Sequence, residues 1–304
     1  MSRWLVRLVA VAGGAAVLAG CGSSPDPAPA ADDDGTIAVV ASTGVWGDVA
    51  AVVGGSDVTV TSIVSGTGGD PHSYQVTARD AATLRDADLV VSNGGGYDEW
   101  VDQALDSDSG PPRVVAVELH RPTAEASDNE HVWYDLNGVG DVADEIAMKL
   151  GEIRPDAKAA FDANAAAFRE KLDGLAAAVA EVSAEYGGAS VAATEPVAHY
   201  LLSEAGLTDV TPAEFVEAVE EGDDPPAAAV ADIQRAVSDR EVAVLVHNPQ
   251  TETPVVTDLV DKAQDAGVPV VDLTEMLPDG QDYLTWMGNQ IAALSKALES
   301  GTTR

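Results

Sequence analysis

Two histidines and two carboxylates stand in short polar segments whose residue types could bind a metal ion. His72 lies behind Gly-Gly-Asp-Pro in "GGDPHSYQVTARD", and His131 lies in "NEHVWYD". Glu195 lies in "VAATEPVAHY", and Asp282 lies in "LPDGQDYLTWM". Two imidazoles and two carboxylates can hold zinc tetrahedrally, and carboxylate oxygens also suit manganese. If the fold brings these side chains together, they form a site for a divalent transition metal.

The elements that must position these side chains follow from the hydrophobic pattern. Strands are predicted at 36–42, 58–64, 88–93 and 113–119, and again at 190–194, 241–247 and 268–273. Alanine-rich segments with helical periodicity lie between them. This alternation is typical of βαβ units with parallel sheets, here in two sets. The predicted fold class is therefore α/β, with two lobes that each contain a parallel sheet and flanking helices.

A long helix is predicted between the two sets of strands, from Pro155 to Tyr186. Apolar residues recur there at alternating spacings of four and three, at Phe161, Ala165, Phe168, Leu172, Leu175, Val179 and Val182. Such a stripe marks one face of a continuous helix, which would reach about 48 Å at 1.5 Å per residue. A coiled-coil partner is an alternative, but the short, alanine-rich stripe favours packing across both lobes. We expect one long rigid backbone helix that joins the lobes.

The predicted strands place all four candidate ligands at one edge. In open parallel sheets, ligands bind beyond the carboxyl ends of the strands. His72 and His131 each follow a strand of the first set, whereas Glu195 and Asp282 each follow a strand of the second set. Taken singly, each is more often a solvated side chain. Their coincidence at the edge where the lobes would meet indicates a metal site.

The N-terminus is typical of an exported protein. Arg3 and Arg7 precede a short apolar run that ends in "LAGC", which predicts a signal peptide over residues 1–20. The run is shorter than the roughly 20 apolar residues that cross a bilayer. "LAGC" resembles the lipobox of bacterial lipoproteins, in which the cysteine is acylated. Cys21 is the single cysteine of the chain. We therefore expect an extracytoplasmic protein that a lipid on Cys21 anchors to the cell membrane.

Composition divides the rest of the chain. Residues 21–35 are rich in Pro, Ser, Ala and Asp, which predicts a flexible acidic tether. We place an N-terminal lobe at 36–150, the linking helix at 151–187 and a C-terminal lobe at 188–304, and expect a separate core in each lobe. The formal net charge of −35 excludes nucleic acid as a partner and concentrates cations, although acidity alone often reflects only solubility.

At the candidate ligands the sequence resembles a known family. "DPHSYQVTARD" is similar to Asp-Pro-His-x-Tyr-x-x-Thr-x-x-Asp, and "HVWYD" to His-Val-Trp-x-Asp. These are signatures of the manganese- and zinc-binding lipoproteins that feed ABC metal importers. "ATEPVAHYLLSEAGL" stands where that family has Thr-Ser-Glu or Thr-Ser-His at the start of a helix. The resemblance covers nearly the whole mature chain.

The resemblance implies a binding function without enzymatic activity. It implies a monomer that carries one divalent metal ion, manganese or zinc, as a transported ligand, with an ABC permease as its partner. It also implies that His72, His131 and Glu195 are three of the metal ligands.

The fourth ligand is open because two alignments of "GQDYLTWM" compete. The family has an Asp shortly before a Tyr and a Met. If the Tyr-Leu-x-x-Met spacing is kept, Gln281 takes the ligand's place, and if the carboxylate is kept, Asp282 does. We choose Asp282, because a neutral amide binds a divalent cation weakly, and hold Asp279 in reserve. His199 and His247 are further candidates for lining the cleft.

The ligand set leaves the choice of metal open. Within the resembling family, a Glu at the third position goes more often with manganese, and zinc binders often carry a His-rich loop before the second ligand. The segment "HRPTAEASDNEHVW" contains only His120 and His131, so that loop is absent. Zinc, however, exceeds manganese in intrinsic affinity for almost any such site.

Two other functions remain as alternatives. A binding protein for a metal chelate, such as a siderophore, would also use two lobes joined by a rigid helix, but it would line its cleft with aromatic or arginine side chains. A secreted zinc hydrolase would need an open coordination position and a general base, and no HExxH or G-x-S-x-G motif is present. A purely adhesive lipoprotein is a third and least favoured alternative, because it would explain none of the histidine motifs.

Overall fold

The computed structural model describes residues 35–66, 71–105, 110–120 and 129–302, and the statements below concern these residues. The predicted signal peptide, Cys21 and nearly all of the predicted tether lie outside them. None of the described helices is both long enough and apolar enough to cross a bilayer.

The first lobe is built on a parallel sheet of four strands. They are β1 (Ile37–Thr43), β2 (Val58–Val64), β3 (Leu89–Ser92) and β4 (Arg113–Val115), in the order β2-β1-β3-β4. The helical segments of this lobe are α1 (Gly44–Gly54), η1 (Gly55–Asp57), α2 (Ala78–Arg85), α3 (Glu99–Ala104), α4 (Ala116–Leu119) and η2 (Val132–Tyr134). The carboxyl ends of the four strands therefore share one edge.

The second lobe repeats this strand order. Its sheet contains β5 (Ser190–Ala193), β6 (Thr208–Asp209), β7 (Val244–His247) and β8 (Val270–Asp272), in the order β6-β5-β7-β8. Its helical segments are η3 (Pro196–Ala198), α7 (His199–Glu204), α8 (Ala213–Glu220), α9 (Ala227–Ser238), α10 (Pro254–Ala266) and α11 (Tyr283–Thr302). The predicted α/β class with two parallel sheets is confirmed.

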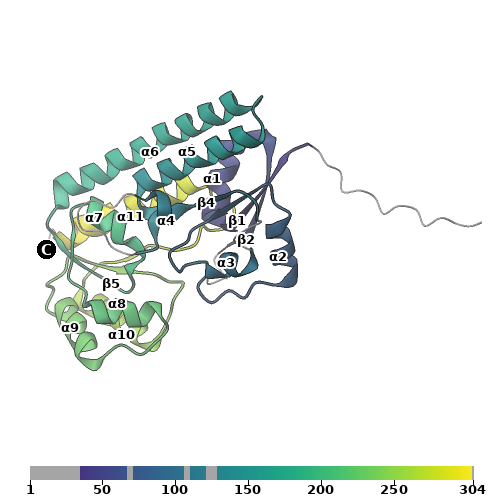
Figure 1. The fold of residues 1–304 in the computed structure, drawn as a ribbon. Coiled ribbons are helices and arrows are strands. Elements are labelled where there is room, and N and C mark those ends of the chain that lie inside the picture. The colour runs from purple at the N-terminus through teal and green to yellow at the C-terminus, as the bar shows by residue number, and fades with distance from the viewer. Residues whose placement is uncertain (1–34, 67–70, 106–109, 121–128, 303–304) are drawn as a thin grey trace, which may run out of the picture. The chain divides into compact units, whose positions relative to one another are not determined.

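A helical hairpin joins the lobes along one side (Figure 1). It consists of α5 (Leu136–Ile153) and the long helix α6 (Lys158–Tyr186), which packs against α1 of the first lobe and against α7 and α11 of the second. The predicted connecting helix is thus confirmed, although it begins at Lys158 and not at Pro155. Residues 155–157 form the turn of the hairpin, closed by a hydrogen bond from the Ala157 N–H to the Arg154 carbonyl (3.1 Å).

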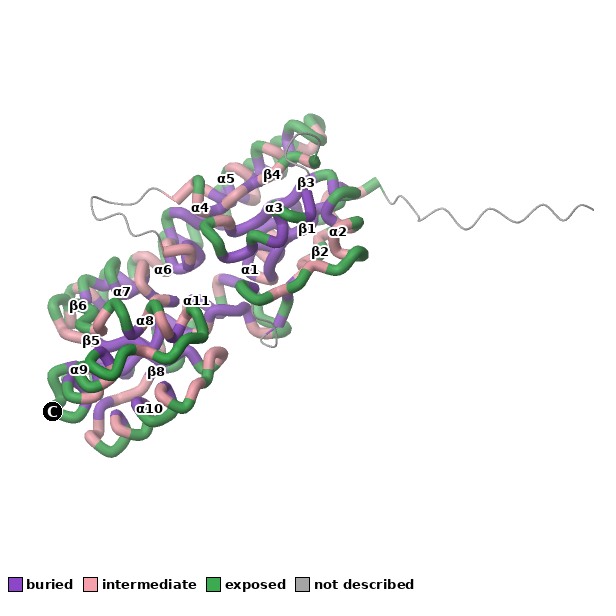
Figure 2. The backbone as a smooth tube through the Cα atoms, turned by 60° about the horizontal axis from the view of Figure 1, so that its bottom comes forward, coloured by how far each residue is buried: buried purple, intermediate pink, exposed green. Residues whose placement is uncertain are grey.

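The main hydrophobic core runs through both lobes. Val39 and Ala41 of β1 belong to the same buried cluster as Val191 and Ala193 of β5, and the buried stripe of α6 completes it. The intervening Val40 points to the other face of its sheet, into a second cluster with α2 and α3. Figure 2 shows these strands as the buried interior. The cores of the lobes are thus separate only in part: the main cluster continues from one lobe to the other, whereas a cluster around α9 and α10 lies in the second lobe alone.

Two strand predictions differ from the structure. The strand predicted at 113–119 ends at Val115, and residues 116–119 form the short helix α4 instead. The exposed two-residue strand β6 was not predicted, because it offers no apolar run to detect. The strand-end positions of the candidate ligands are nevertheless close to those expected.

Candidate metal centre

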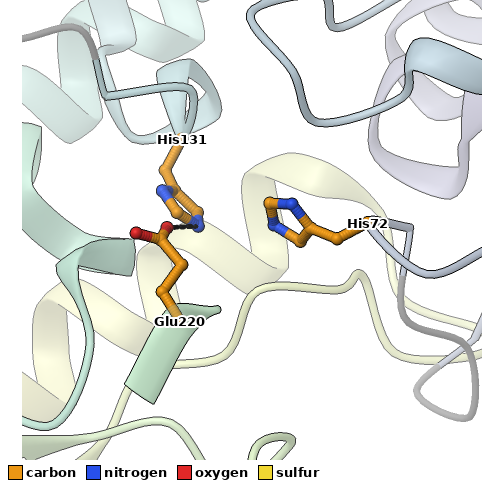
Figure 3. A group of neighbouring side chains, drawn as sticks. All are labelled: His72, His131 and Glu220. Atoms are coloured by element: carbon orange, nitrogen blue, oxygen red, sulfur yellow. Dashed lines mark ion pairs between the residues drawn. The ribbon is translucent and has the colours of Figure 1, made fainter. Parts of the chain in front are cut away.

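Three potential metal ligands from distant parts of the chain meet between the lobes. One ligand atom each from His72, His131 and Glu220 lies within 4.8 Å of the other two. Figure 3 shows the three side chains facing one another. His72 and His131 belong to the first lobe, whereas Glu220 is the last residue of α8 in the second. The structure thus confirms that the two predicted histidines are neighbours, and it adds a carboxylate that the sequence did not indicate.

The position of His72 is fixed by the residues around it in its motif. The indole N–H of Trp100 donates to the carbonyl of Pro71 (3.2 Å), which holds the chain just before His72. After it, the Tyr74 hydroxyl donates to Asp80 (2.8 Å), whose carboxylate also belongs to the capping box that begins α2. The motif therefore ties the loop of His72 to a helix start on one side and to α3 on the other.

His131 is buried, and its ring orientation is fixed by Asn129. Its residue is 1% exposed, and Asn129 Oδ1 accepts hydrogen bonds from its backbone N–H (2.8 Å) and from its ring Nδ1 (3.0 Å). The ring edges of His72 and His131 approach the buried ring of Tyr97, with centroid distances of 4.9 and 6.2 Å. Burial, and then the charges of His72 and His199, lower the pKa of His131 to about 3. His131 is therefore a neutral imidazole at physiological pH.

Glu220 lies opposite this imidazole in an acidic environment. His131 Nε2 and Glu220 Oε1 are 3.7 Å apart. Burial, and then the charges of Glu130, Glu195, Glu275 and Glu221, raise the pKa of Glu220 to about 8. Since a carboxylate in this position is disfavoured without a cation, the metal-free site retains a proton near neutral pH.

Glu130 adds a carboxylate on the side of His72. Its Oε1 lies 3.6 Å from His72 Nδ1. Burial raises the pKa of Glu130, and the positive charge of His72 opposes that rise. Several partly desolvated carboxylates thus surround two imidazoles, an arrangement that a divalent cation would stabilise strongly.

The spacing of these atoms fits a metal ion. Because Asn129 Oδ1 can only accept, Nδ1 of His131 carries the ring proton, and Nε2 presents its lone pair toward Glu220. Two ligand atoms that are each about 2.0–2.2 Å from a tetrahedral zinc ion lie roughly 3.4 Å apart. The observed 3.7 Å between Nε2 and Oε1 is close to this separation, so only a small adjustment is needed.

The two carboxylates predicted from the sequence lie in different surroundings. Glu195 is 5% exposed and accepts a hydrogen bond from Asn248 Nδ2 (2.7 Å), and its charge acts on Glu220. Asp282 is exposed and accepts hydrogen bonds from the backbone N–H and the hydroxyl of Thr285 (2.8 and 2.9 Å), which lower its pKa. Asp282 thus caps α11 and is not among the residues that the structure brings together.

The remaining candidates lie around the site or away from it. His199 is partly buried, which lowers its pKa, and its charge acts on His131, so it lies beside the centre. His247 pairs through its two ring nitrogens with Asp272 (2.8 Å) and Glu252 (3.2 Å). Gln281 and Asp279 are both exposed; the Asp279 carboxylate lies over Gly66 of the first lobe.

Glu275 is a second carboxylate that the sequence analysis missed. It is 7% exposed, it follows β8 by three residues, and its charge raises the pKa of Glu220. The backbone N–H groups of Glu275 and Met276 both donate to Gln250 Oε1 (2.7 and 2.8 Å). The rule that ligands follow strand ends could have identified Glu275. No comparable signal marks Glu220, which ends a helix.

One loop of the second lobe supports both buried carboxylates. Between β7 and α10, Asn248 donates to Glu195, and Gln250 accepts from the backbone of Glu275. The Gln250 N–H in turn donates to Asn248 Oδ1 (3.1 Å). Such supporting hydrogen bonds orient acidic side chains before an ion arrives.

Comparison with known proteins adds independent information. A family profile described as the periplasmic component A of the zinc-uptake complex, ZnuA, matches residues 39–297. The manganese-binding lipoprotein MntA of Halalkalibacterium halodurans is 32% identical over 164 residues, which cover 53% of this chain and 54% of MntA. The zinc-binding lipoprotein AdcA of Streptococcus pneumoniae is 24% identical over 268 residues, which cover 80% of this chain and 52% of AdcA. The chain spans about half the length of these curated relatives.

Solved structures share the fold. The laminin-binding protein Lmb of Streptococcus agalactiae, described as an adhesin with metal-transporting activity, has a TM-score of 0.73 at 22% identity and covers 86% of this chain and 99% of Lmb. Zinc-bound AdcA of S. pneumoniae has a TM-score of 0.69 at 24% identity and covers 87% of this chain and 58% of AdcA. At these identities the likeness establishes the fold alone.

The raised pKa of Glu220 predicts a pH-dependent effect of Glu220→Gln on the metal-free protein. A folded-state pKa of about 8, against an ordinary 4.5, means that stability is lost as the pH rises through this interval. Glutamine mimics the protonated carboxyl group. The variant should therefore melt several degrees higher than the wild type at about pH 9 in the presence of a chelator, and the gain should vanish toward about pH 5.

The exposed Glu214 of the same helix supplies the control, because its charge is not among those that act on Glu220. Glu214→Gln should show no such pH-dependent gain in a calorimetric series. An equal gain for Glu220→Gln at both pH values, or no gain at about pH 9, would contradict the electrostatic description of the site.

Proposed function

The chain belongs to the family of the periplasmic zinc-uptake component A, ZnuA, and from this premise we propose that it is a solute-binding protein that captures one divalent transition metal ion, zinc or manganese, between its lobes. We further propose that it delivers the ion to an ABC-type permease. The observation that carries the proposal is the meeting of His72 and His131 of one lobe with the Glu220 carboxylate of the other. In this proposal the metal is cargo, and the chain is not an enzyme.

The proposed ligands are two imidazoles and carboxylates of the second lobe. Glu195 is retained on its resemblance to the third ligand of related proteins, and Glu275 takes the place of Asp282 as a proposed ligand. Glu275 is buried and electrostatically linked to Glu220, whereas Asp282 caps a helix. With Glu220 included, three carboxylates provide more donors than tetrahedral zinc needs.

This carboxylate-rich set bears on the choice between the two metals. Oxygen ligands suit manganese, which accepts more of them than tetrahedral zinc does, whereas imidazole suits zinc. The proposal therefore includes both metals. They are also the metals in the names of the relatives, manganese for MntA and zinc for AdcA. We expect zinc to bind more tightly in a direct competition, in keeping with its higher intrinsic affinity for nitrogen and oxygen sites.

The two alternative functions have weaker support. A chelate binder would need a cleft large enough for an organic ligand, but here the imidazoles and Glu220 already lie within 4.8 Å of one another. A zinc hydrolase would need a coordination position open to water, and the extra carboxylates of this site would compete for that position. A divalent cation without a chelator, by contrast, could be bound by the imidazoles and the carboxylates together.

A metal titration of the soluble form that begins after Cys21 tests the proposal and the fourth ligand together. The wild type should bind one ion per chain in competition with a chromophoric chelator. His72→Ala and His131→Ala should each weaken binding by more than the roughly 10–100-fold typical of the loss of a supporting residue. Glu275→Gln should be far more damaging than Asp282→Asn, because an amide does not neutralise the cation.

Asp282→Asn is the matched control, since it changes an exposed carboxylate by the same chemistry. A larger loss of affinity from Asp282→Asn than from Glu275→Gln would restore Asp282 as the ligand. Unchanged titrations in both histidine variants would refute the metal site as a whole.

We also propose that Cys21 anchors the protein to the outside of the cell membrane. The proposal is supported by the "LAGC" sequence and by the lipoprotein names of MntA and AdcA. Cys21→Ser removes the only thiol that could be acylated. The variant should therefore move from the membrane fraction to the soluble fraction, as measured by immunoblotting. Retention of a signal-cleaved Cys21→Ser chain on membranes would contradict the lipid anchor.

A further inference from the structure

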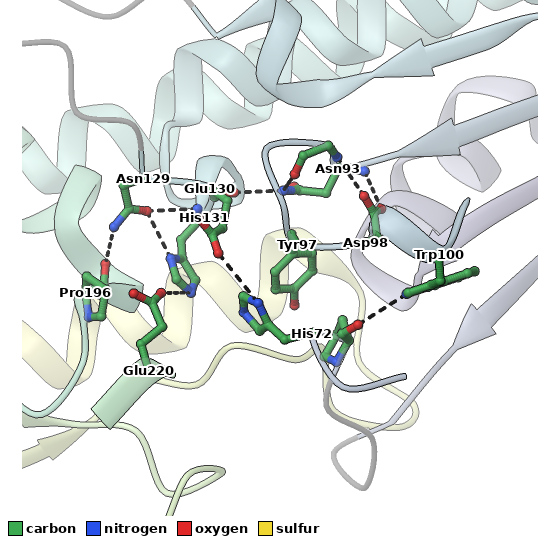
Figure 4. Close-up of polar contacts among 12 residues, drawn as sticks. His72, Asn93, Tyr97, Asp98, Trp100, Asn129, Glu130, His131, Pro196 and Glu220 are labelled. Atoms are coloured by element: carbon green, nitrogen blue, oxygen red, sulfur yellow. Dashed lines mark hydrogen bonds and ion pairs between the residues drawn. The ribbon is translucent and has the colours of Figure 1, made fainter. Parts of the chain in front are cut away.

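Asn129 contacts a proposed metal ligand on one side and the second lobe on the other. Its Oδ1 accepts from the backbone N–H (2.8 Å) and ring Nδ1 (3.0 Å) of His131. Its Nδ2 donates to the carbonyl of Pro196 (2.9 Å), and its own carbonyl accepts from the Tyr200 hydroxyl (2.6 Å). Figure 4 shows Asn129 between Pro196 and His131. Pro196 directly follows Glu195, so the same contact reaches the segment of a proposed carboxylate ligand.

The chemistry of the partners fixes the orientation of the Asn129 amide. The backbone N–H of His131 can only donate, so the atom that faces it must be the amide oxygen. The carbonyl of Pro196 can only accept, so the atom that faces it must be the NH₂ group. With the oxygen so placed, Nδ1 of His131 must carry the ring proton, which leaves Nε2 as the nitrogen that faces Glu220.

Two other hydrogen bonds between the lobes, among the residues that the structure describes, lack this double role. The Tyr134 hydroxyl donates to the Thr274 carbonyl (2.8 Å), and the Tyr283 hydroxyl donates to the Trp133 carbonyl (2.7 Å). Both join the lobes close to the centre, but neither uses an atom of the His131 imidazole. Asn129 binds that ring and the opposite lobe through the two ends of one rigid planar amide.

We propose that Asn129 is a positioning residue that couples the orientation of His131 to the closure of the second lobe over the metal. The inference rests on the proposed metal-binding function. Closure places Pro196 against the amide, and the amide then holds the imidazole in the tautomer that can coordinate through Nε2. When the Pro196 and Tyr200 segment of the second lobe withdraws locally, the side-chain amide loses its hydrogen bond to the Pro196 carbonyl, the Asn129 carbonyl loses the one from Tyr200, and His131 loses its fixed orientation. Metal retention and lobe closure therefore stabilise each other, as linkage requires.

Three variants separate the two halves of this role. Asn129→Ala removes both the acceptor for His131 and the donor to Pro196. Asn129→Asp keeps an acceptor for the ring but replaces the donor by an oxygen that faces the Pro196 carbonyl. Tyr200→Phe leaves the amide intact and removes only the hydroxyl that reaches Asn129. Asn137→Ala is the matched control, because Asn137 is exposed and its hydrogen bond to Asp135 uses its backbone N–H.

Two measurements then test the coupling. Nitrogen-15 NMR of the metal-free protein reports the tautomer of His131, and stopped-flow transfer of zinc to a chelator reports the release rate. Asn129→Ala should give a mixture of tautomers and a roughly 10–100-fold lower affinity. Asn129→Asp should keep the Nδ1–H tautomer, yet it should release zinc about tenfold faster, within the range known for supporting residues. Tyr200→Phe should also release zinc faster without a change of tautomer.

The outcomes distinguish failure of the inference from failure of the proposed function. If the wild type binds no metal, the proposed function fails, while the tautomer in metal-free Asn129→Ala still tests the positioning of His131. If the wild type binds metal but the tautomers and release rates of the Asn129 variants match Asn137→Ala, the inference is overturned. Should Asn129→Ala fail to fold, Asn129→Asp and Tyr200→Phe decide the matter through their release rates.

Discussion

The metal centre depends on one continuous apolar core that holds the two sheets at a fixed separation. Alternate residues of β1 and β5 enter this shared core, and the buried face of α6 packs along it. Because protein interiors are close-packed, a large rotation of one lobe against the other would open voids in this layer. The core thereby holds a neutral imidazole and a carboxyl group of opposite lobes 3.7 Å apart.

The electrostatic cost of that arrangement explains how the site can select a cation. Burial depresses the pKa of His131, and burial together with four neighbouring carboxylates raises that of Glu220. Both shifts show that the charged form of each side chain is disfavoured in the folded site. A divalent ion would bind the neutral imidazole and stabilise the charged carboxylate of Glu220. Asn129 accepts a hydrogen bond from the His131 ring, Asn248 donates to the Glu195 carboxylate, and Gln250 accepts from the Glu275 backbone, so these three side chains hold the surroundings of the site in place.

Much of the fold and part of the site could be predicted because their signals are local. The β-branched runs predicted two parallel sheets, and the stripe from Phe161 to Val182 predicted the connecting helix. The two histidine motifs predicted imidazoles that lie close together. When both faces of a strand are buried, however, its sequence does not reveal which layer each residue contacts. The shared core was therefore invisible in the sequence.

The carboxylates show the same limit at the level of single residues. Asp282 has the position of an N-cap, and Thr285 three residues later supplies the N–H and hydroxyl that occupy its carboxylate. Asp282 was preferred to Gln281 because a carboxylate binds a divalent cation better than an amide, but the same carboxylate chemistry also suits a helix cap. Glu275 follows a strand end and was within reach of the rule used for the other ligands. Glu220 ends a helix of the second lobe, and only the packing of the lobes brings it to His131.

The central claim is that both lobes coordinate one ion, and a crystal of the metal-loaded protein tests it most directly. Anomalous diffraction collected at the zinc or manganese absorption edge locates the ion without reference to any assumed ligand. The claim predicts one strong peak within coordination distance of His72 and His131 of the first lobe and of at least one of Glu195, Glu220 and Glu275 of the second. A peak bound by one lobe alone, or a peak elsewhere on the acidic surface with none between the two histidines, would contradict it.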